Sequence, residues 1–187
     1  MPPKQHALRV NGKRRLGALL GRGSSKSVHL FLDKRVAVAV CTPRHGACFQ
    51  HEVSILELVQ GCAHLLQMIR GDRTELVLEL APFGSVVDLA DTLEFAGDDG
   101  LTLAHVECAA AQVETALQTL AALGWEHGDL RAQNVLVFAF HLKVPSLMHV
   151  KLGDFGSSCK YTHGESLTAL RRELHNLCPH NQVSPPP

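Results

Sequence analysis

Polar side chains at predicted strand ends in the second half of the chain could together bind a metal ion and a phosphate. Asp129 and Asn134 lie five residues apart in the segment HGDLRAQNVLV, and Asp154 ends a predicted strand in the segment MHVKLGDFG. Mg²⁺ prefers oxygen ligands and keeps phosphate oxygens in its coordination shell. The Asp154 carboxylate and the Asn134 amide could therefore hold Mg²⁺ against a nucleotide, while Asp129 orients an attacking hydroxyl. With Arg131 as a nearby cation, these residue types indicate phosphoryl transfer.

A glycine-rich turn near the N-terminus is typical of a loop that covers nucleotide phosphates. In the segment GRGSSKSV, Gly21 and Gly23 precede Lys26 and Val28, and short strands are predicted on both sides. Lys26 stands on the second of these strands. A lysine at that place could supply the positive charge that a phosphate site requires.

Two groups of elements are predicted to position these residues. Residues 16–80 predict a small α+β lobe with an amphipathic helix at 51–59. The strands expected in this lobe are 16–20, 28–32, 36–41, 65–69 and 75–80, with a turn at 33–34. Residues 81–178 predict a second, mainly helical lobe after the linker LAPFG, with helices at 103–123 and 167–177. Flexible tails are expected at residues 1–15, which are basic, and 179–187, which are proline-rich.

The two polar segments resemble the catalytic loop and the magnesium loop of the protein kinases, HRDxxxxN and DFG. The match covers Asp129, Leu130, residues 134–136 and the whole of residues 154–156. Both motifs occur in the expected order, after an aliphatic helix and a glycine-rich turn. The resemblance implies an α+β, two-lobed protein kinase-like fold, with a five-stranded antiparallel N-lobe that carries one helix. It also implies ATP and Mg²⁺ as cofactors and a protein substrate.

The same resemblance assigns further positions. Glu52 corresponds to the glutamate of the N-lobe helix that pairs with the phosphate-binding lysine, with Glu57 as the alternative. Leu78 would be the gatekeeper, and the backbone of Glu79 and Ala81 would hydrogen-bond adenine. The apolar residues expected to enclose the adenine ring are Val28, Ala39 and Leu136.

The sequence departs from the usual kinase pattern at the phosphate-binding lysine. The predicted strand 36–41 ends in Cys41 where that lysine normally stands, and Lys26 occupies the third glycine position of the flap. This pairing resembles the with-no-lysine kinases, and the protein-O-mannose kinase family also has a lysine at this place in the flap. Lys26 could therefore reach the α- and β-phosphates and pair with Glu52. The alternative is a solvated Lys26 in a pseudokinase.

Other departures concern regulation and the C-lobe. Gly128 replaces the arginine of HRD, which normally binds a phosphorylated loop, and this argues against control by loop phosphorylation. Phe155 stands where the with-no-lysine kinases have leucine, so chloride sensing is not carried over. The resemblance covers about residues 16–157, and we recognise neither an APE motif nor the central helix with its aspartate. The C-lobe is therefore expected to be incomplete, although the helix at 167–177 could stand in for the missing central helix. Without the rest of the lobe, the apolar face of helix 103–123 is expected to be poorly covered. The chain would then be a truncated product, a minimal kinase-like fold, or a fold whose gap a regulatory protein partner covers.

Composition limits the classes of function. The formal net charge of the 187 residues is zero, which argues against nucleic-acid or membrane-surface binding by bulk electrostatics. No apolar run approaches the roughly 20 residues of a membrane span, and no secretory signal is recognised. The six cysteines are scattered and form no CxxC pair, as is typical of reduced thiols in the cytoplasm or the nucleus.

Three functions stay open from the sequence. The first is an ATP-dependent phosphotransferase of the protein kinase type, with serine/threonine acceptors favoured over tyrosine. The second is a nucleotide-binding or empty pseudokinase that acts as a scaffold. The third is a truncated, non-catalytic kinase fragment.

Overall fold

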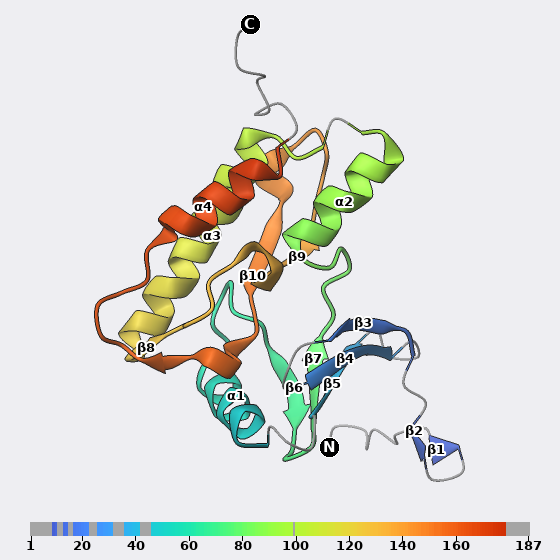
Figure 1. The fold of residues 1–187 in the computed structure, drawn as a ribbon, viewed down its shortest axis with the longest axis vertical. Helices are drawn as coiled ribbons and strands as arrows, with labels where there is room; N and C mark the ends of the chain where they lie inside the picture. The colour runs from blue at the N-terminus through green and yellow to red at the C-terminus, as the bar shows by residue number, and fades with distance from the viewer. Residues whose placement is uncertain are drawn as a thin grey trace, which may run out of the picture.

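The computed structural model describes residues 9–10, 13–14, 17–22, 26–31, 36–41, 46–98 and 100–178. They form an N-terminal sheet with one helix beside it and a C-terminal group of helices and short strands (Figure 1). Some predicted features lie outside the described residues, namely Leu16, Gly23, Leu32, the turn at 33–34 and the tail 179–187. Within the predicted N-terminal tail, β1 (Arg9–Val10) pairs antiparallel with β2 (Lys13–Arg14), and the rest of residues 1–15 is outside the description.

The N-terminal sheet has five antiparallel strands in the order β3-β4-β5-β7-β6. The strands are β3 (Leu19–Arg22), β4 (Lys26–Phe31), β5 (Val36–Cys41), β6 (Met68–Gly71) and β7 (Glu75–Glu79). Strands β5 and β7 are rich in aliphatic residues and are buried along their middle positions, as expected for the centre of a sheet. The predicted five-stranded antiparallel sheet is confirmed. Strand β6 starts at Met68 rather than at Leu65, because Leu65 forms a bridge with Leu152 of the C-terminal part.

The helix of this part, α1 (Gly46–Leu58), begins five residues earlier than the predicted start at 51. Phe49, in the added turn, is buried and anchors the helix. The buried face contains Glu52 among Phe49, Ile55 and Leu56. A carboxylate on an otherwise apolar face requires a partner, and the sheet supplies it.

Within the described residues of the C-terminal part, the helices are α2 (Val86–Ala96), α3 (Leu103–Ala122) and α4 (Leu167–Asn176). The sequence predicted α3 and α4 but gave no range for α2. Helix α2 begins at a capping box, in which Ser85 Oγ accepts from the Asp88 amide and the Ser85 amide donates to the Asp88 carboxylate. No helix among the described residues combines the length and the apolar character that crossing a bilayer requires.

Short strands and 3₁₀ turns carry the polar motifs. The strands are β8 (Trp125–Glu126), β9 (Val135–Ala139), β10 (His149–Leu152) and β11 (Cys159–Lys160). The 3₁₀ turns are η3 (Ala132–Asn134), η4 (Pro145–Leu147) and η5 (Phe155–Ser157). Strand β9 pairs with β10, and β8 pairs with β11, both antiparallel. The start of β9 therefore lies beside the end of β10. This brings the segment with Asp129 and Asn134 close to the segment with Asp154.

The expectation of a poorly covered α3 is wrong. Of the five residues predicted on its apolar face, Val106, Ala110, Val113 and Leu120 are at most 1% exposed, and Leu117 is partly buried against the core. Helix α4 and strand β10 pack against this face, and α4 lies alongside α3 in Figure 1. The leucine stripe of α4, which includes the buried Leu170 and Leu174, explains the difference together with β10, because the two elements cover this face of α3.

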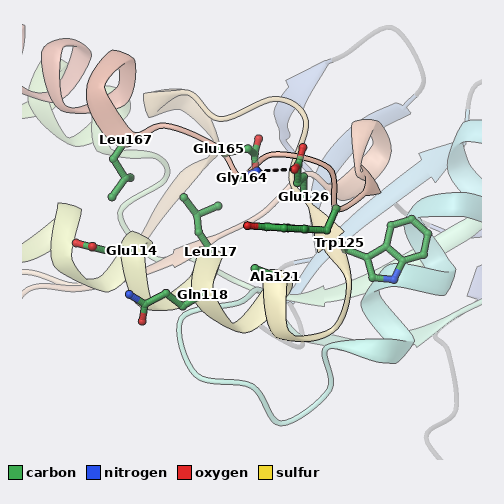
Figure 2. A pocket seen from close by; sticks show the side chains of 10 residues that line it. Glu114, Leu117, Gln118, Ala121, Trp125, Glu126, Gly164, Glu165 and Leu167 are labelled. Atoms are coloured by element: carbon green, nitrogen blue, oxygen red, sulfur yellow. Dashed lines mark hydrogen bonds between the residues drawn. The ribbon is translucent and has the colours of Figure 1, made fainter.

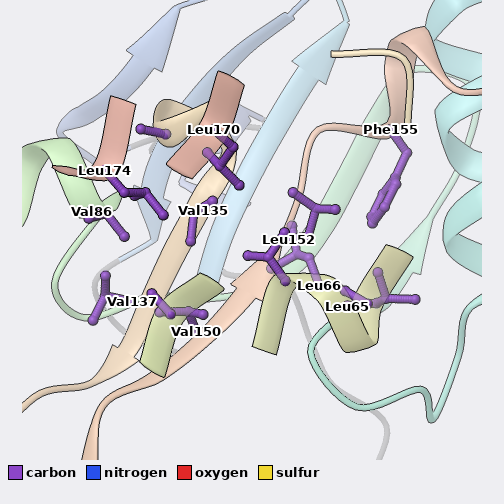
Figure 3. Close-up of a cluster of buried hydrophobic side chains, with 14 of the residues drawn as sticks. Leu65, Leu66, Val86, Val135, Val137, Val150, Leu152, Phe155, Leu170 and Leu174 are labelled. Atoms are coloured by element: carbon purple, nitrogen blue, oxygen red, sulfur yellow. The ribbon is translucent and has the colours of Figure 1, made fainter. Parts of the chain in front are cut away.

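The two parts share one hydrophobic core. Figure 3 shows Leu65 and Leu66, which precede the sheet strand β6, beside Leu152 and Phe155 of the C-terminal part. The backbone continues this contact, since the Leu66 amide donates to the Leu152 carbonyl at 2.9 Å and the Leu152 amide donates to the His64 carbonyl at 2.8 Å. Asp154 follows Leu152 by two residues, so its position is fixed from both parts.

Candidate active site

Asp129 and Asn134 meet at the start of β9. The Asn134 amide nitrogen donates to the backbone carbonyl of Asp129 at 2.8 Å and to its carboxylate at 3.1 Å. Asn134 is almost fully buried in η3, whereas Asp129 is half-buried and so accessible to an acceptor. Because the amide nitrogen is used in this way, the amide oxygen of Asn134 is the atom available for a cation.

His127 fixes the backbone that leads to Asp129. It is fully buried, its Nε2 donates to the Gly153 carbonyl at 2.9 Å, and its Nδ1 accepts from the Asp129 amide at 3.3 Å. Burial lowers the pKa of His127, despite the opposing effects of the Gly153 carbonyl and nearby carboxylates. A neutral imidazole matches this pattern of one donor and one acceptor. The role of His127 was not predicted, although its place at the start of the HGD motif was the available signal.

Asp154 sits at a strained turn. Its φ of 65° lies in the left-handed region, which a non-glycine residue rarely adopts. Before it, Gly153 packs so closely that an added Cβ would lie 3.1 Å from both Leu66 and Leu136. Strain of this kind persists where the surroundings over-determine the backbone, and it concentrates at functional sites.

Lys26 joins the N-terminal sheet to Asp154 and to α1. Its ammonium donates to Glu52 in a buried ion pair and to the Asp154 carboxylate at 2.7 Å. Lys26 is 7% exposed and Glu52 is 2% exposed, whereas the alternative partner Glu57 is exposed on the other side of α1. The structure therefore brings together Lys26, Glu52 and Asp154 from three separate elements.

The pKa shifts of these three groups follow from burial and from one another. Burial alone would lower the pKa of Lys26, but the carboxylates of Glu52 and Asp154 outweigh it and raise the pKa, so the ammonium stays charged. Burial raises the pKa of Glu52 against the opposing effect of Lys26. Burial also opposes ionisation of Asp154, but Lys26 holds the pKa of that carboxyl below its usual range.

Comparison with known protein families matches residues 20–181 to the family of protein tyrosine and serine/threonine kinases. The chain belongs to this family. The match extends beyond residue 157, where the motifs recognised in the sequence ended, and it includes α4. The α+β, two-lobed kinase-like fold predicted from the sequence is confirmed. A search of curated proteins finds no match.

The residues that a kinase would place around adenine come from three strands of the N-terminal sheet and from β9 of the C-terminal part. Val28 of β4 is directly opposite Ala39 of β5, and Ala39 is fully buried. Leu136 of β9 forms a bridge with Ser85 at the other side of the interlobe linker. Leu78, the predicted gatekeeper, is buried in β7. These positions are core residues in the structure, and their contact with adenine stays a prediction.

The hinge of this kinase fold carries an ion pair that the sequence did not predict. Lys151 Nζ donates to both carboxylate oxygens of Glu79, at 2.7 and 2.8 Å. The backbone amide of Gln67 donates to the same carboxylate at 2.8 Å. Lys151 lies three residues before Asp154. The Glu79 side chain is therefore bonded to β10, the strand that leads to Asp154. Ala81 follows in the linker, where its carbonyl accepts from the Gly84 backbone amide at 3.2 Å.

Two predicted residues are placed differently from the rest. Arg131 is exposed and donates from Nε to Gln133 at 2.9 Å, within its own loop. Gly21 lies in β3 opposite Val28, with open space where a Cβ would stand. Gly21 is therefore on the strand that covers the adenine-side residues, while Gly23 lies outside the described residues.

The donor set of this site fits Mg²⁺ held together with a nucleotide. Asp154 and Asn134 each offer an oxygen, and the Asp154 carboxylate remains 46% exposed despite its contact with Lys26. Among the described residues, no group of three or more histidine, cysteine, aspartate or glutamate side chains could hold a metal ion by itself. A site with two protein oxygens needs phosphate oxygens or water to complete the shell, which is how Mg²⁺ binds in phosphoryl-transfer enzymes.

Proposed function

We propose that this chain is an ATP-dependent phosphotransferase of the protein kinase type in which Lys26 replaces the usual phosphate-binding lysine. The observation that carries the proposal is the contact of one buried ammonium with both Glu52 and Asp154. A charged lysine held between the N-lobe helix and the metal-binding aspartate is the arrangement that phosphate binding requires. A solvated Lys26 would be exposed and unpaired, and neither is the case.

Each residue has a distinct role in the proposed reaction. Mg²⁺ would neutralise charge on the phosphates, held by Asp154 and Asn134. Lys26 would place positive charge beside the α- and β-phosphates, and Glu52 would keep its ammonium in position. Asp129 would accept the hydrogen bond of the acceptor hydroxyl and take its proton at the carboxylate.

The acceptor is proposed to be a protein hydroxyl, with serine and threonine favoured over tyrosine. The compartment is proposed to be the cytoplasm or the nucleus, because the six cysteines are scattered along the sequence without a CxxC pair, as is typical of reduced thiols. Peptide pools that carry serine, threonine or tyrosine as the acceptor would separate the specificities directly.

The decisive experiment measures transfer of labelled phosphate from Mg-ATP to the chain itself and to a generic protein substrate. Lys26→Met and Asp154→Ala should each lower the rate by about 10² to 10³, because each removes a preorganised charge at the phosphates. Lys143→Met is the matched control, since Lys143 is exposed on the loop between β9 and β10. Full activity in Lys26→Met would contradict the role of Lys26. Binding of Mg-ATP without any transfer by the parent chain would instead indicate a pseudokinase.

A further inference from the structure

Two glutamates connect the catalytic loop with the segment that follows Phe155. Glu165 accepts from the backbone amides of His127 and Gly128 at 2.5 and 2.7 Å. In the opposite direction, Glu126 accepts from the amides of Thr162, His163 and Gly164, at 2.8, 2.9 and 2.8 Å. Each carboxylate therefore comes from one segment and binds the backbone of the other.

Two glycines with left-handed backbone conformations and a close backbone contact accompany these hydrogen bonds. Gly128 and Gly164 both have φ near 80°, in the left-handed region. An added Cβ at Gly128 would lie 2.2 Å from the Ser157 carbonyl, so the two segments touch at this point. Strand β11 pairs with β8 immediately before the loop, and the Tyr161 amide donates to the Gly124 carbonyl at 3.0 Å. The contacts are thus part of a continuous connection between the segments.

Figure 2 shows Glu126 and Glu165 side by side at the edge of a cavity of about 360 Å³, with the bond from Gly164 drawn. Leu117 and Ala121 of α3 form another wall of this cavity. Both glutamate side chains are only partly buried, and their carboxylates accept hydrogen bonds from backbone N–H groups. Glu126 accepts three of these groups on a single oxygen, which is how a carboxylate orders an adjacent loop.

We propose that Glu126 and Glu165 act as positioning residues that hold the catalytic loop and the segment 161–165 in their working arrangement without a phosphorylated side chain. This inference rests on the proposed function, because the residue being positioned is Asp129. The family arginine that would bind a loop phosphate is absent, and Gly128 takes its place. Glu165 instead supplies a permanent negative charge to the backbone at that same position. Asp129 comes directly after Gly128, so the backbone that Glu165 holds is the backbone that aims the Asp129 carboxylate.

The test compares Glu165→Gln and Glu126→Gln with the control Glu94→Gln, whose side chain is exposed near the end of α2. A glutamine keeps the size of the side chain but has a single acceptor oxygen and no charge. In Glu165→Gln one of the two amides loses its acceptor, because Glu165 uses one oxygen for each amide. In Glu126→Gln the accepting oxygen remains, but its three hydrogen bonds lose the negative charge that strengthens them. We expect Glu165→Gln to speed hydrogen exchange at the amides of His127 and Gly128 by about tenfold or more. Glu126→Gln should do the same at residues 162–164, and the control should change neither group. Unchanged exchange in both variants would overturn the proposal.

Kinetics supply the second measurement. Glu165→Gln should lower kcat by about tenfold or more while KM for ATP stays unchanged, because only the aim of Asp129 is affected. Treatment with a phosphatase should leave the parent rate unchanged, and a loss of activity on dephosphorylation would overturn the proposal. If the parent chain transfers no phosphate, the proposed function fails, and the exchange measurement alone decides whether the two glutamates hold the segments together.

Discussion

Lys26 and Cys41 lie directly opposite each other on the antiparallel strands β4 and β5. Side chains of opposed residues in a sheet point to the same face, with Cβ atoms about 5 Å apart. A lysine at either position would therefore start from nearly the same point and extend toward α1 and Asp154. This register supports the proposal that Lys26 supplies the charge that the lysine at the position of Cys41 carries in other kinases.

This relationship predicts that the lysine can be returned to the neighbouring strand. The double variant Lys26→Gly, Cys41→Lys should regain phosphoryl transfer to within about tenfold of the parent, because a single preorganised cation is worth about 10² to 10³ in rate. Lys26→Gly alone should stay inactive, and Cys41→Lys alone serves as the control for the new side chain. Rates of labelled phosphate transfer measure all three variants. A double variant as inactive as Lys26→Gly would show that the position of the lysine matters as much as its charge.

Loss of Lys26 should also leave a pH-dependent defect in stability. In Lys26→Met the buried Glu52 carboxylate has no cation at the Lys26 position, and removing one partner of a buried ion pair costs about 3–5 kcal/mol. The pKa of Glu52 is already raised by burial, and loss of Lys26 removes its opposing effect. A raised pKa in the folded state stabilises the protein below the unfolded-state pKa and loses this contribution as the pH rises. The difference in unfolding free energy between Lys26→Met and the parent should therefore grow from pH 4 to pH 8 in denaturant titrations.

The matched control for that experiment is Lys26→Met, Glu52→Gln, in which the buried carboxylate is neutral. Its stability difference from the parent should be smaller and nearly independent of pH in the same range. An equal pH dependence in both variants would assign the effect to a group other than Glu52.

The sequence predicted the parts of this site that depend on local patterns. The motif with Asp129 and Asn134 precedes the aliphatic strand β9, and Asp154 follows the aliphatic strand β10, so both motifs lie where a strand and a turn meet. The resemblance to the glutamate of the kinase N-lobe helix favours Glu52 over Glu57, and the structure places Glu52 beside Lys26. Helices and strands can be predicted where apolar residues recur at a regular spacing within one short segment.

Most of the features that the sequence did not predict depend on contacts between distant residues. The exception is α2, whose N-terminal capping box is a local signal. Glu165 contacts backbone amides 37 and 38 residues away, and no local pattern marks such a contact. The coverage of α3 depends on how α4 packs back onto it, which sequence spacing does not fix. Helix α2 did have a local signal, since Ser85 and Asp88 have the spacing of a capping box.

The ion pair between Glu79 and Lys151 should contribute measurable stability because both side chains are largely buried. A double-mutant cycle with Glu79→Gln and Lys151→Met should give a coupling energy of about 1 kcal/mol or more, from unfolding in denaturant. The exposed pair between Glu107 and Arg171 is the comparison, and its coupling should be about 0.2–1 kcal/mol. A hinge pair no stronger than the exposed pair would show that Lys151 does not restrain the hinge.

Glu126 should titrate far below an ordinary glutamate. Backbone amides of Thr162, Gly164 and His163 lower its pKa to about 2. Because the folded-state pKa is lowered, its stabilising contribution is present above the unfolded-state pKa and is lost as the pH falls toward 2. Side-chain carboxyl shifts in NMR spectra should show no titration of Glu126 between pH 6 and pH 4. A normal titration curve for Glu126 would mean that the loop amides do not point at it in solution.

Gly128 cannot be replaced by the arginine that the family carries at this place. Gly128 and Gly124 have nearly the same φ, 78° and 80°, but a Cβ at Gly124 would meet open space, whereas one at Gly128 would overlap the Ser157 carbonyl. Gly124→Ala should cost about 1–2 kcal/mol from backbone strain alone. Gly128→Ala should cost about 3 kcal/mol or more, since the catalytic loop and the segment after Phe155 must also separate. Denaturant unfolding measures both, and equal losses would show that the two segments are further apart than the structure indicates. Gly128→Arg should likewise destabilise the protein, because the Cβ of the arginine would overlap the Ser157 carbonyl oxygen.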